Sequence, residues 1–233
     1  MILSIHQPSY FPWLGLLHKI ASSDRYMVMD EVQLTDSAYQ HRNLFLSADG
    51  KVKFLTIPFN RKEYLRRSFR ELEIRDQSWR TDHLNFIRNG YRKHPFFDEI
   101  FPILTGYYAQ EYFLLIDAVL ASMRISLDLF GITTGVIRQS DCDYDRSLTR
   151  GDLVISLAAQ SGADCYLSGL GANAYLDPSA FPANIALLYD HFEHPRYDQI
   201  NSPEFVPGLS CLDLLFNLGT SASRGILAES LLQ

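Results

Sequence analysis

The sequence predicts an α/β fold: a mostly parallel, Rossmann-like sheet flanked by helices, with a helical insertion. Residues 1–19 have the pattern of a buried strand, a tight loop and a helix. The last third of the chain returns to the same alternation of short apolar runs and helical periods, which is typical of parallel sheets. Between them, about residues 79–130 show only helical periods. Because no composition shift marks a linker, we expect one α/β domain over residues 1–233.

The first element is an apolar run, Met1–Ile5, long enough for a buried strand and too short for a helix. Pro8 removes a backbone donor, so strand pairing should stop before it. Pro12 suits the first turn of a helix, which continues through Leu14, Leu17 and Ile20. In a parallel sheet the loop between them lies at the carboxyl edge, where ligands bind. The alternative is a loop whose aromatic residues only cover the sheet edge. The polar and aromatic residues of this loop are His6, Gln7, Tyr10 and Trp13.

A second strand is predicted over Arg25–Asp30, an apolar run that ends in an acidic residue. Asp49-Gly50 is a strong turn signal between two strand-like runs, of which the second is Lys51–Phe59. The basic segment Arg61–Arg70 has the pattern of a solvated face, with an anion contact as the alternative.

The middle of the chain predicts three helices that pack against the core. They span Trp79–His94, Phe96–Tyr108 and Glu111–Phe130, and Gly131 is placed to cap the last one. The apolar stripe of the third helix is continuous, so it indicates core packing and carries no functional signal.

The last third predicts three more strands and two more helices. Thr149-Arg-Gly-Asp152 resembles a capping box that opens a helix. Gly169-Leu-Gly171-Ala172 forms a glycine-rich loop directly after a strand. The expected strands are Thr133–Arg138, Asp164–Ser168 and Ile185–Tyr189, and the expected helices run from Thr149 through Ala159 and from Cys211 to Leu218.

Composition narrows the functional classes. The net charge of −6 argues against a broad nucleic-acid-binding face. No cationic segment leads into an apolar leader, and no uninterrupted apolar run approaches the length of a membrane span. The three cysteines, Cys142, Cys165 and Cys211, are far apart and fit a reducing compartment, so we expect a cytoplasmic protein. Because the histidines lack zinc-site spacing, no metal site is expected.

Three loops should meet if the strands are parallel: His6–Trp13, Asp30–Asn43 and Ser168–Ala172. The backbone N–H groups of the glycine-rich loop would approach a phosphate or carboxylate closely, helped by a helix that follows, although a tight turn explains the glycines equally well. Arg42 would bind the same anion through its guanidinium fork, whereas an ordinary polar loop is the alternative for Asn43.

His6 is the best placed candidate for acid–base chemistry, because imidazole titrates near neutral pH. His18 is a further candidate whose alternative is an exposed helical residue, and Asp30 could hold a ribose, orient His6 or bind a metal. The sequence contains neither a GxSxG elbow nor a Walker loop, which leaves hydrolase triads and P-loop enzymes unsupported. The candidate substrate contacts are Gln7, Tyr10, Trp13, Gln33, Arg42, Asn43, Ser168, Gly169, Gly171, Ala172, Tyr175 and His194.

Several motifs together resemble the WbqC-like family. They are His6-Gln7-Pro8, Tyr10-Phe-Pro-Trp-Leu-Gly15, Asp30 with Val32-Gln33, Arg42-Asn43, Tyr166-Leu-Ser-Gly169 with Gly171-Ala172, Tyr175-Leu-Asp177, Phe192 with His194-Pro195 and Tyr197, and Leu209-Ser210 through Asn217. The resemblance implies a product of bacterial O-antigen or surface-polysaccharide gene clusters, where some members have been suggested to be glycine transferases. A weaker similarity links the opening strand and loop to nucleotidylyltransferases, but their HxGH histidines are absent here.

From the resemblance we expect a transferase that joins glycine or another small acyl group to an amino sugar on a nucleotide. An adenylate-forming or nucleotidyl-transfer enzyme and a non-catalytic nucleotide-sugar-binding module are the alternatives. The acyl transfer needs an activated donor, such as an adenylate or a charged tRNA, and the sequence leaves the choice between that donor and ATP open. The expected partner is a small nucleotide or nucleotide sugar, and a homodimer is one of the assemblies left open.

Overall fold

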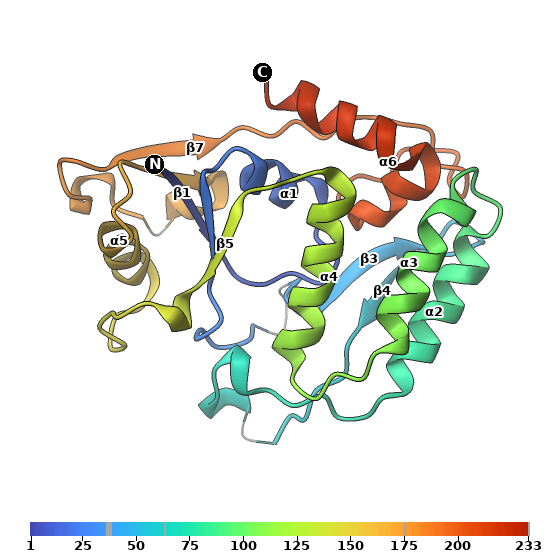
Figure 1. The fold of residues 1–233 in the computed structure, drawn as a ribbon, viewed down its shortest axis with the longest axis horizontal. Helices are drawn as coiled ribbons and strands as arrows, with labels where there is room; N and C mark the ends of the chain where they lie inside the picture. Colours follow the sequence, from blue (N-terminus) through green and yellow to red (C-terminus); the bar gives the residue numbers. More distant parts are fainter. Residues whose placement is uncertain (36–38, 63, 175, 233) are drawn as a thin grey trace.

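The computed structural model describes residues 1–35, 39–62, 64–174 and 176–232, with the side chains of 173 and 174 excepted. Its centre is a five-stranded sheet in the order β5-β2-β1-β6-β7, in which every pair of neighbours is parallel (Figure 1). The five strands are β1 (Ile2–His6), β2 (Arg25–Val28), β5 (Gly135–Arg138), β6 (Cys165–Gly169) and β7 (Ala186–Asp190).

The strand order identifies where a ligand can bind. The chain begins in the middle of the sheet, adds β2 and β5 on one side, and then crosses β1 to add β6 and β7 on the other. In chain order this is third, second, first, fourth, fifth, the order of Rossmann-like sheets, so the predicted fold class is confirmed. Strands are added on one side of β1 first and on its other side from β6 onward. The loops that follow β1 and β6 therefore diverge between these two strands.

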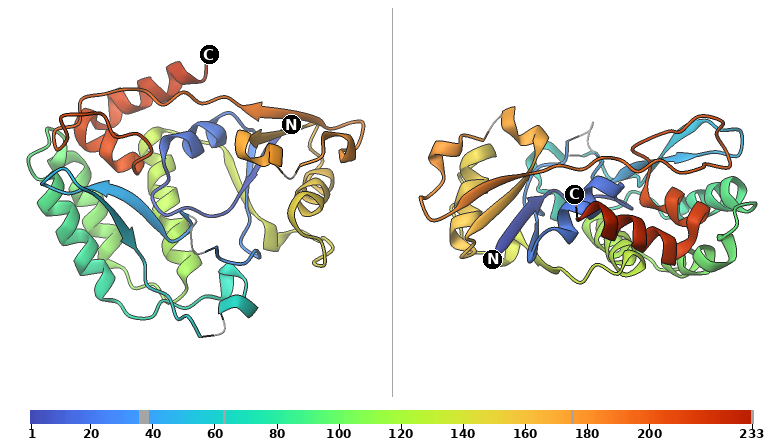
Figure 2. Two further views of the ribbon diagram at one scale, coloured as in Figure 1. Left: turned by 180° about the vertical axis from the view of Figure 1, so that it is seen from behind. Right: turned by 90° about the horizontal axis from the view of Figure 1, so that it is seen from above.

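Helices cover both faces of the sheet, as the apolar strands require (Figures 1 and 2). Along β2 the buried side chains alternate: Tyr26 and Val28 pack into the larger apolar cluster, whereas Met27 packs into the smaller one on the opposite face. Helices α1 (Leu14–Ala21), α4 (Leu115–Phe130) and α6 (Cys211–Ser230) contribute to the larger cluster, and α5 (Arg150–Gln160) contributes to the smaller.

The connection from β2 to β5 contains the predicted helical insertion and a separate antiparallel hairpin. Both views place α2 and α3 at the end of the molecule opposite α5 (Figures 1 and 2). The turn predicted at Asp49-Gly50 joins the two strands of the hairpin, and Gly50 takes a φ of 76° there. The insertion comprises β3 (Arg42–Leu46), β4 (Val52–Thr56), the 3₁₀ segments η1 (Tyr64–Arg66) and η2 (Phe69–Glu71), α2 (Ser78–Tyr91), α3 (Phe97–Ala109) and α4.

Helix ends follow local chemistry in some places and not in others. Gly131 caps α4 in the left-handed region, with a φ of 70°, as the sequence predicted. The predicted helix after Thr149 is present, but the Thr149 side chain makes no capping hydrogen bond. The helix predicted to end at Leu218 is interrupted there, because Gly219 adopts a non-helical conformation (φ 75°, ψ 171°), and α6 resumes after this kink and runs to Ser230.

One expectation about the glycine-rich loop is wrong. In the described residues between β6 and β7 there is no α-helix; they form η4, a 3₁₀ segment at Leu170–Ala174, and η5, a 3₁₀ segment at Pro178–Ala180. Because the dipole of one short 3₁₀ turn is small, the loop lacks the helix N-terminus that was expected to attract an anion.

Among the residues that the structure describes, no helix combines the length and the apolar character needed to span a bilayer.

Candidate functional site

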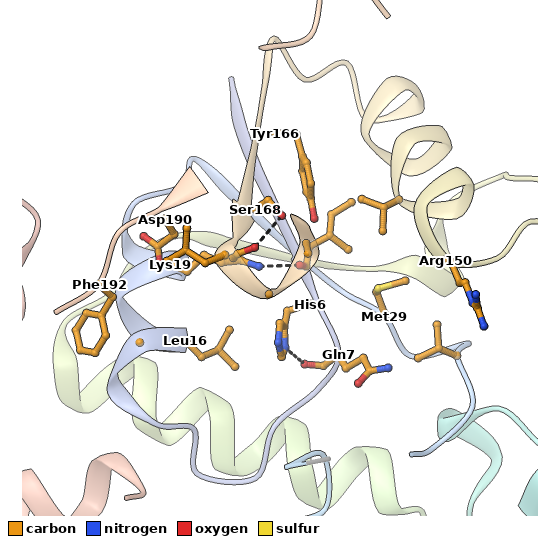
Figure 3. A pocket seen from close by; sticks show the side chains of 18 of the residues that line it. His6, Gln7, Leu16, Lys19, Met29, Arg150, Tyr166, Ser168, Asp190 and Phe192 are labelled. Carbon is orange, nitrogen blue, oxygen red and sulfur yellow. Dashed lines mark hydrogen bonds between the residues drawn. The ribbon is translucent and has the colours of Figure 1, made fainter. Parts of the chain in front are cut away.

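A cleft of about 810 Å³ opens at the carboxyl ends of β1 and β6, where the strand order reverses (Figure 3). Its walls come from β1 and the loop after it, α1, the end of β6, the first turns of α5, and the end of β7. A cavity of this size at this position is the usual binding place for a small ligand in an open α/β sheet.

Two of the three loops expected to meet do meet in this cleft. The sequence candidates that line it are His6, Gln7, Trp13, Ser168, Gly169, Gly171 and Ala172. Of the described residues in the loop after β2, Met29 and Val32 line the cleft. The cleft therefore forms between β1 and β6, and the β2 loop borders it on one side.

His6 ends β1 and its ring is exposed to the cleft (Figure 3). Its Nδ1 lies 2.8 Å from the carbonyl oxygen of Gln7, which can only accept, so Nδ1 carries the proton. Burial by the surrounding protein, followed by the positive charge of Lys19, lowers the pKa of His6 to about 4. At neutral pH the imidazole is therefore neutral, and its Nε2 presents a lone pair.

Trp13 forms an aromatic wall beside α1. Its side chain is 39% exposed, and its ring lies over Gly15, where an added Cβ would come within 2.2 Å of a ring carbon. Phe192 packs edge-on against the indole at 5.6 Å between ring centroids. Gly15 is thus required by the close approach of the tryptophan, and the two aromatic rings offer an apolar surface for a planar or sugar ring.

The glycine-rich loop leaves open space in the cleft. Neither Gly169 nor Gly171 has a positive φ, and an added Cβ at either would meet no described atom within 4 Å. The Oγ of Ser168, which is fully buried, donates to the Gly169 carbonyl at 3.3 Å. These glycines are therefore not needed for the backbone conformation, and their effect is to keep this side of the cleft free of side chains.

Tyr10 does not lie in the cleft, which corrects its expected role in substrate binding. Its side chain is completely buried, and its hydroxyl bonds to Nδ1 of His83 at 3.0 Å and to the hydroxyl of Tyr108. Asn43 is also fully buried, on β3, and its Nδ2 donates to the carbonyls of Tyr10 (3.1 Å) and Phe11 (2.7 Å). Both residues fix the loop after β1 onto the insertion.

Asp30 is at the expected edge of the sheet but turns away from His6. Its carboxylate accepts from the backbone N–H of Ser140 at 3.0 Å and from the Ser140 hydroxyl at 2.8 Å. The carboxylate therefore joins the loops that follow β2 and β5. Gln33 nearby donates from Nε2 to the Leu65 carbonyl at 2.9 Å and likewise lies outside the cleft lining.

Arg42 and His194 also lie outside the cleft lining. Arg42 belongs to the hairpin, because the chain leaves the parallel sheet before this residue. Its guanidinium packs over the Phe54 ring, 4.3 Å from the ring centroid. The Nδ1 of His194 lies 2.8 Å from the carbonyl of its neighbour Pro195. Tyr175 lies outside the described residues.

Comparison with known proteins agrees with the sequence motifs. The model of the WbqC-like protein family matches residues 7–224. The chain belongs to this family. A Mycobacterium tuberculosis protein, described as uncharacterized protein Rv1507c, is 26% identical over 223 residues, which cover 94% of this chain and 95% of that protein. No solved structure matches the chain.

Within this WbqC-like chain, His18 has a defined role beside the cleft. It is buried on α1, with Nδ1 2.8 Å from the carboxylate of Asp190 and Nε2 3.2 Å from the Ser230 carbonyl. Both partners accept, so both ring nitrogens donate, and the hydrogen bond to Asp190 raises the pKa of His18. The imidazolium ties α1, β7 and the end of α6 together, and it does not line the cleft.

The lining residues that were not sequence candidates include the three charged residues Lys19, Arg150 and Asp190 and the aromatic residue Phe192. Asp190 is an acidic residue at the end of a strand. The same pattern made Asp30 a candidate, so it could also have identified Asp190. Lys19 follows His18 in a short helix that is otherwise apolar, a pattern that could have marked both residues as buried polar groups. Arg150 opens α5 with a φ of 52°, a strained conformation that periodicity does not reveal.

Among the described residues, no group of three or more histidine, cysteine, aspartate or glutamate side chains is arranged to hold a metal ion.

Proposed function

We propose that this WbqC-like chain is a transferase that attaches glycine or another small acyl group to an amino sugar carried on a nucleotide. The setting would be surface-polysaccharide (O-antigen) assembly in the bacterial cytoplasm. The proposal is supported by family membership and, above all, by His6, whose unprotonated Nε2 lies in a cleft at the reversal point of a Rossmann-like sheet.

In this proposal the nucleotide sugar lies between the loops after β1 and β6. The Trp13 and Phe192 rings provide an apolar face for the sugar or base, and the open space beside Gly169 admits the phosphates close to the backbone. The amine attacks the carbonyl of an activated acyl donor. A C–N bond forms, the bond from the acyl carbon to the leaving group breaks, and Nε2 of His6 takes the amine proton.

The test is a transfer assay with an amino-sugar nucleotide as acceptor and glycyl-adenylate or glycyl-tRNA as donor, with the product detected by mass spectrometry. We expect His6→Ala to abolish turnover, because no other imidazole lines the described part of the cleft, while thermal unfolding stays cooperative. His6→Gln is the matched variant, since it keeps a hydrogen-bonding group that cannot take the proton. Undiminished turnover in both variants would remove His6 as the base.

A second function is favoured by the cations Lys19 and Arg150, which line the cleft of an otherwise acidic protein. Two positive charges suit the phosphates of a nucleoside triphosphate, as in an adenylate-forming or nucleotidyl-transfer enzyme. Thermal stabilisation by ATP without any response to amino-sugar nucleotides would select this function. Binding of an amino-sugar nucleotide without turnover by any donor would select a non-catalytic binding module.

A further inference from the structure

The floor of the cleft contains a buried ammonium group whose hydrogen bonds are incomplete. Lys19 on α1 lines the cleft, yet its side chain is only 5% exposed. Its Nζ donates to the carbonyl of Ile5 at 2.9 Å. Within the described part of the chain this carbonyl is its one hydrogen-bond acceptor, so two of its three N–H donors have none.

The charge of Lys19 is not neutralised by the nearest carboxylate. Asp190 attracts Lys19 but makes no ion pair with it; the carboxylate bonds through Oδ1 to His18 at 2.8 Å. His18 donates from both ring nitrogens and is itself a cation. One negative and two positive charges therefore lie close together, of which Asp190 and Lys19 line the cleft, and one positive charge is left without a counter-ion.

His6 lies on the same floor and offers the complementary group. In Figure 3 the Lys19 side chain extends between Asp190 and Ser168, above the ring of His6. The Nδ1 of His6 is bonded to the Gln7 carbonyl, and no described residue donates to Nε2. Two unpaired N–H donors of a cation and an unpaired acceptor thus belong to side chains that line the same cleft.

Most buried polar groups in folded proteins are paired by the protein, by ordered water or by a ligand, because an unpaired group loses its hydration without compensation. We propose that Lys19 is the anion-binding residue of this cleft. It receives a phosphate or carboxylate oxygen of the substrate, and His6 accepts a hydrogen bond from an N–H or O–H group next to that oxygen.

This inference deepens the proposed function and rests on it for the identity of the natural substrate, but it is tested by binding alone. It places the anion at the end of β1, on α1. The backbone of the glycine-rich loop, the site that the sequence suggested, then borders the rest of the ligand.

The experiment is isothermal titration calorimetry of the full chain at neutral pH with UDP, pyrophosphate and glycine as separate probes. Lys19→Met removes the charge and keeps most of the stem. We expect roughly ten- to hundredfold weaker binding of the anionic probe that wild type binds, as for the loss of a charge-assisted hydrogen bond. Binding of UDP and pyrophosphate identifies a phosphate site, whereas binding of glycine alone identifies a carboxylate site.

Thermal unfolding without ligand separates this role from a structural one. Replacing a lysine that stabilises the fold lowers the stability of the protein. Replacing a buried cation that is kept for a ligand raises it, so we expect the Tm of Lys19→Met to be higher than that of wild type. Lys51→Met is the matched control, because Lys51 is an exposed lysine of the distant hairpin, paired with Asp49 at 2.6 Å. It should bind the probes as wild type does.

The proposal is overturned if Lys19→Met binds every probe as tightly as wild type, if wild type binds none of them, or if the Tm falls with binding unchanged. Failure of the transfer assay alone leaves this binding result unaffected, so the two proposals fail separately.

Discussion

Two buried ionisable side chains of opposite sign, Asp213 on α6 and Lys19 on α1, are treated differently by the fold. The Asp213 carboxylate accepts hydrogen bonds from Tyr91 (3.1 Å), Tyr197 (2.9 Å) and Gln199 (3.0 Å), whereas the Lys19 ammonium has one described acceptor. Both are fully or almost fully buried. The first network is closed by the protein, and the second is left open toward the cleft. The comparison teaches that a completed buried network can serve the fold by itself, whereas an incomplete one that lines a cleft can still accept a ligand, as proposed for Lys19.

The largest expected effect comes from removing the Asp213 carboxylate, the acceptor of the completed network. Asp213→Ala removes the acceptor shared by two tyrosines and two amides, so their donors lose a buried partner. We expect a loss of about 3–5 kcal/mol in the free energy of unfolding, measured by urea titration. Pyrophosphate binding to the folded fraction should be unchanged. A loss below about 1 kcal/mol would mean that water replaces the carboxylate and that the network is not structural.

A smaller effect is expected from replacing Tyr10, and it tests whether this residue packs in the core or binds the ligand. Tyr10→Phe deletes the hydroxyl that bonds to His83 and Tyr108 and keeps the ring. We expect a loss of about 1–2 kcal/mol in unfolding free energy, with unchanged binding of UDP measured by calorimetry. Weakened UDP binding with an unchanged free energy of unfolding would mean that Tyr10 binds the substrate, as the sequence had suggested.

The smallest effect concerns His18, and it depends on pH. Because Asp190 raises the pKa of His18 in the folded state, its stabilisation is complete below the unfolded value near 6.5 and is lost as pH rises through the raised folded value. His18→Gln should therefore lower the unfolding free energy by about 1 kcal/mol in mild acid, and the difference should vanish in base. Urea titrations of both proteins across that pH range measure it. A difference that grows with pH would contradict the assignment of His18 as an imidazolium in the folded protein.

Much of the fold followed from local sequence signals. The apolar run at Met1–Ile5, the turn at Asp49-Gly50 and the glycine cap at Gly131 all lie where the sequence predicted them, since each depends on a few neighbouring residues. The capping hydrogen bond at Thr149 and the helix after the glycine-rich loop did not form. Those features depend on how the chain packs as much as on residue type.

The candidate site was predictable only in part. The loops after β1 and β6 were expected to meet, because the carboxyl ends of parallel strands share an edge, and both line the cleft. Arg42 and Asn43 were assigned to the same rim because they follow β2 in the chain. They lie instead on β3, since the connection from β2 leaves the parallel sheet to form a hairpin of its own.

By itself the sequence determined the α/β class, the family and the strand-end loop that contains His6, because periodicity and short motifs are properties of neighbouring residues. Only the tertiary structure decided which polar groups are left unpaired. Tyr10 finds partners on α2 and α3, and Lys19 does not complete its hydrogen bonds within the described chain. Pairing depends on contacts between residues far apart in the chain, which no local pattern contains.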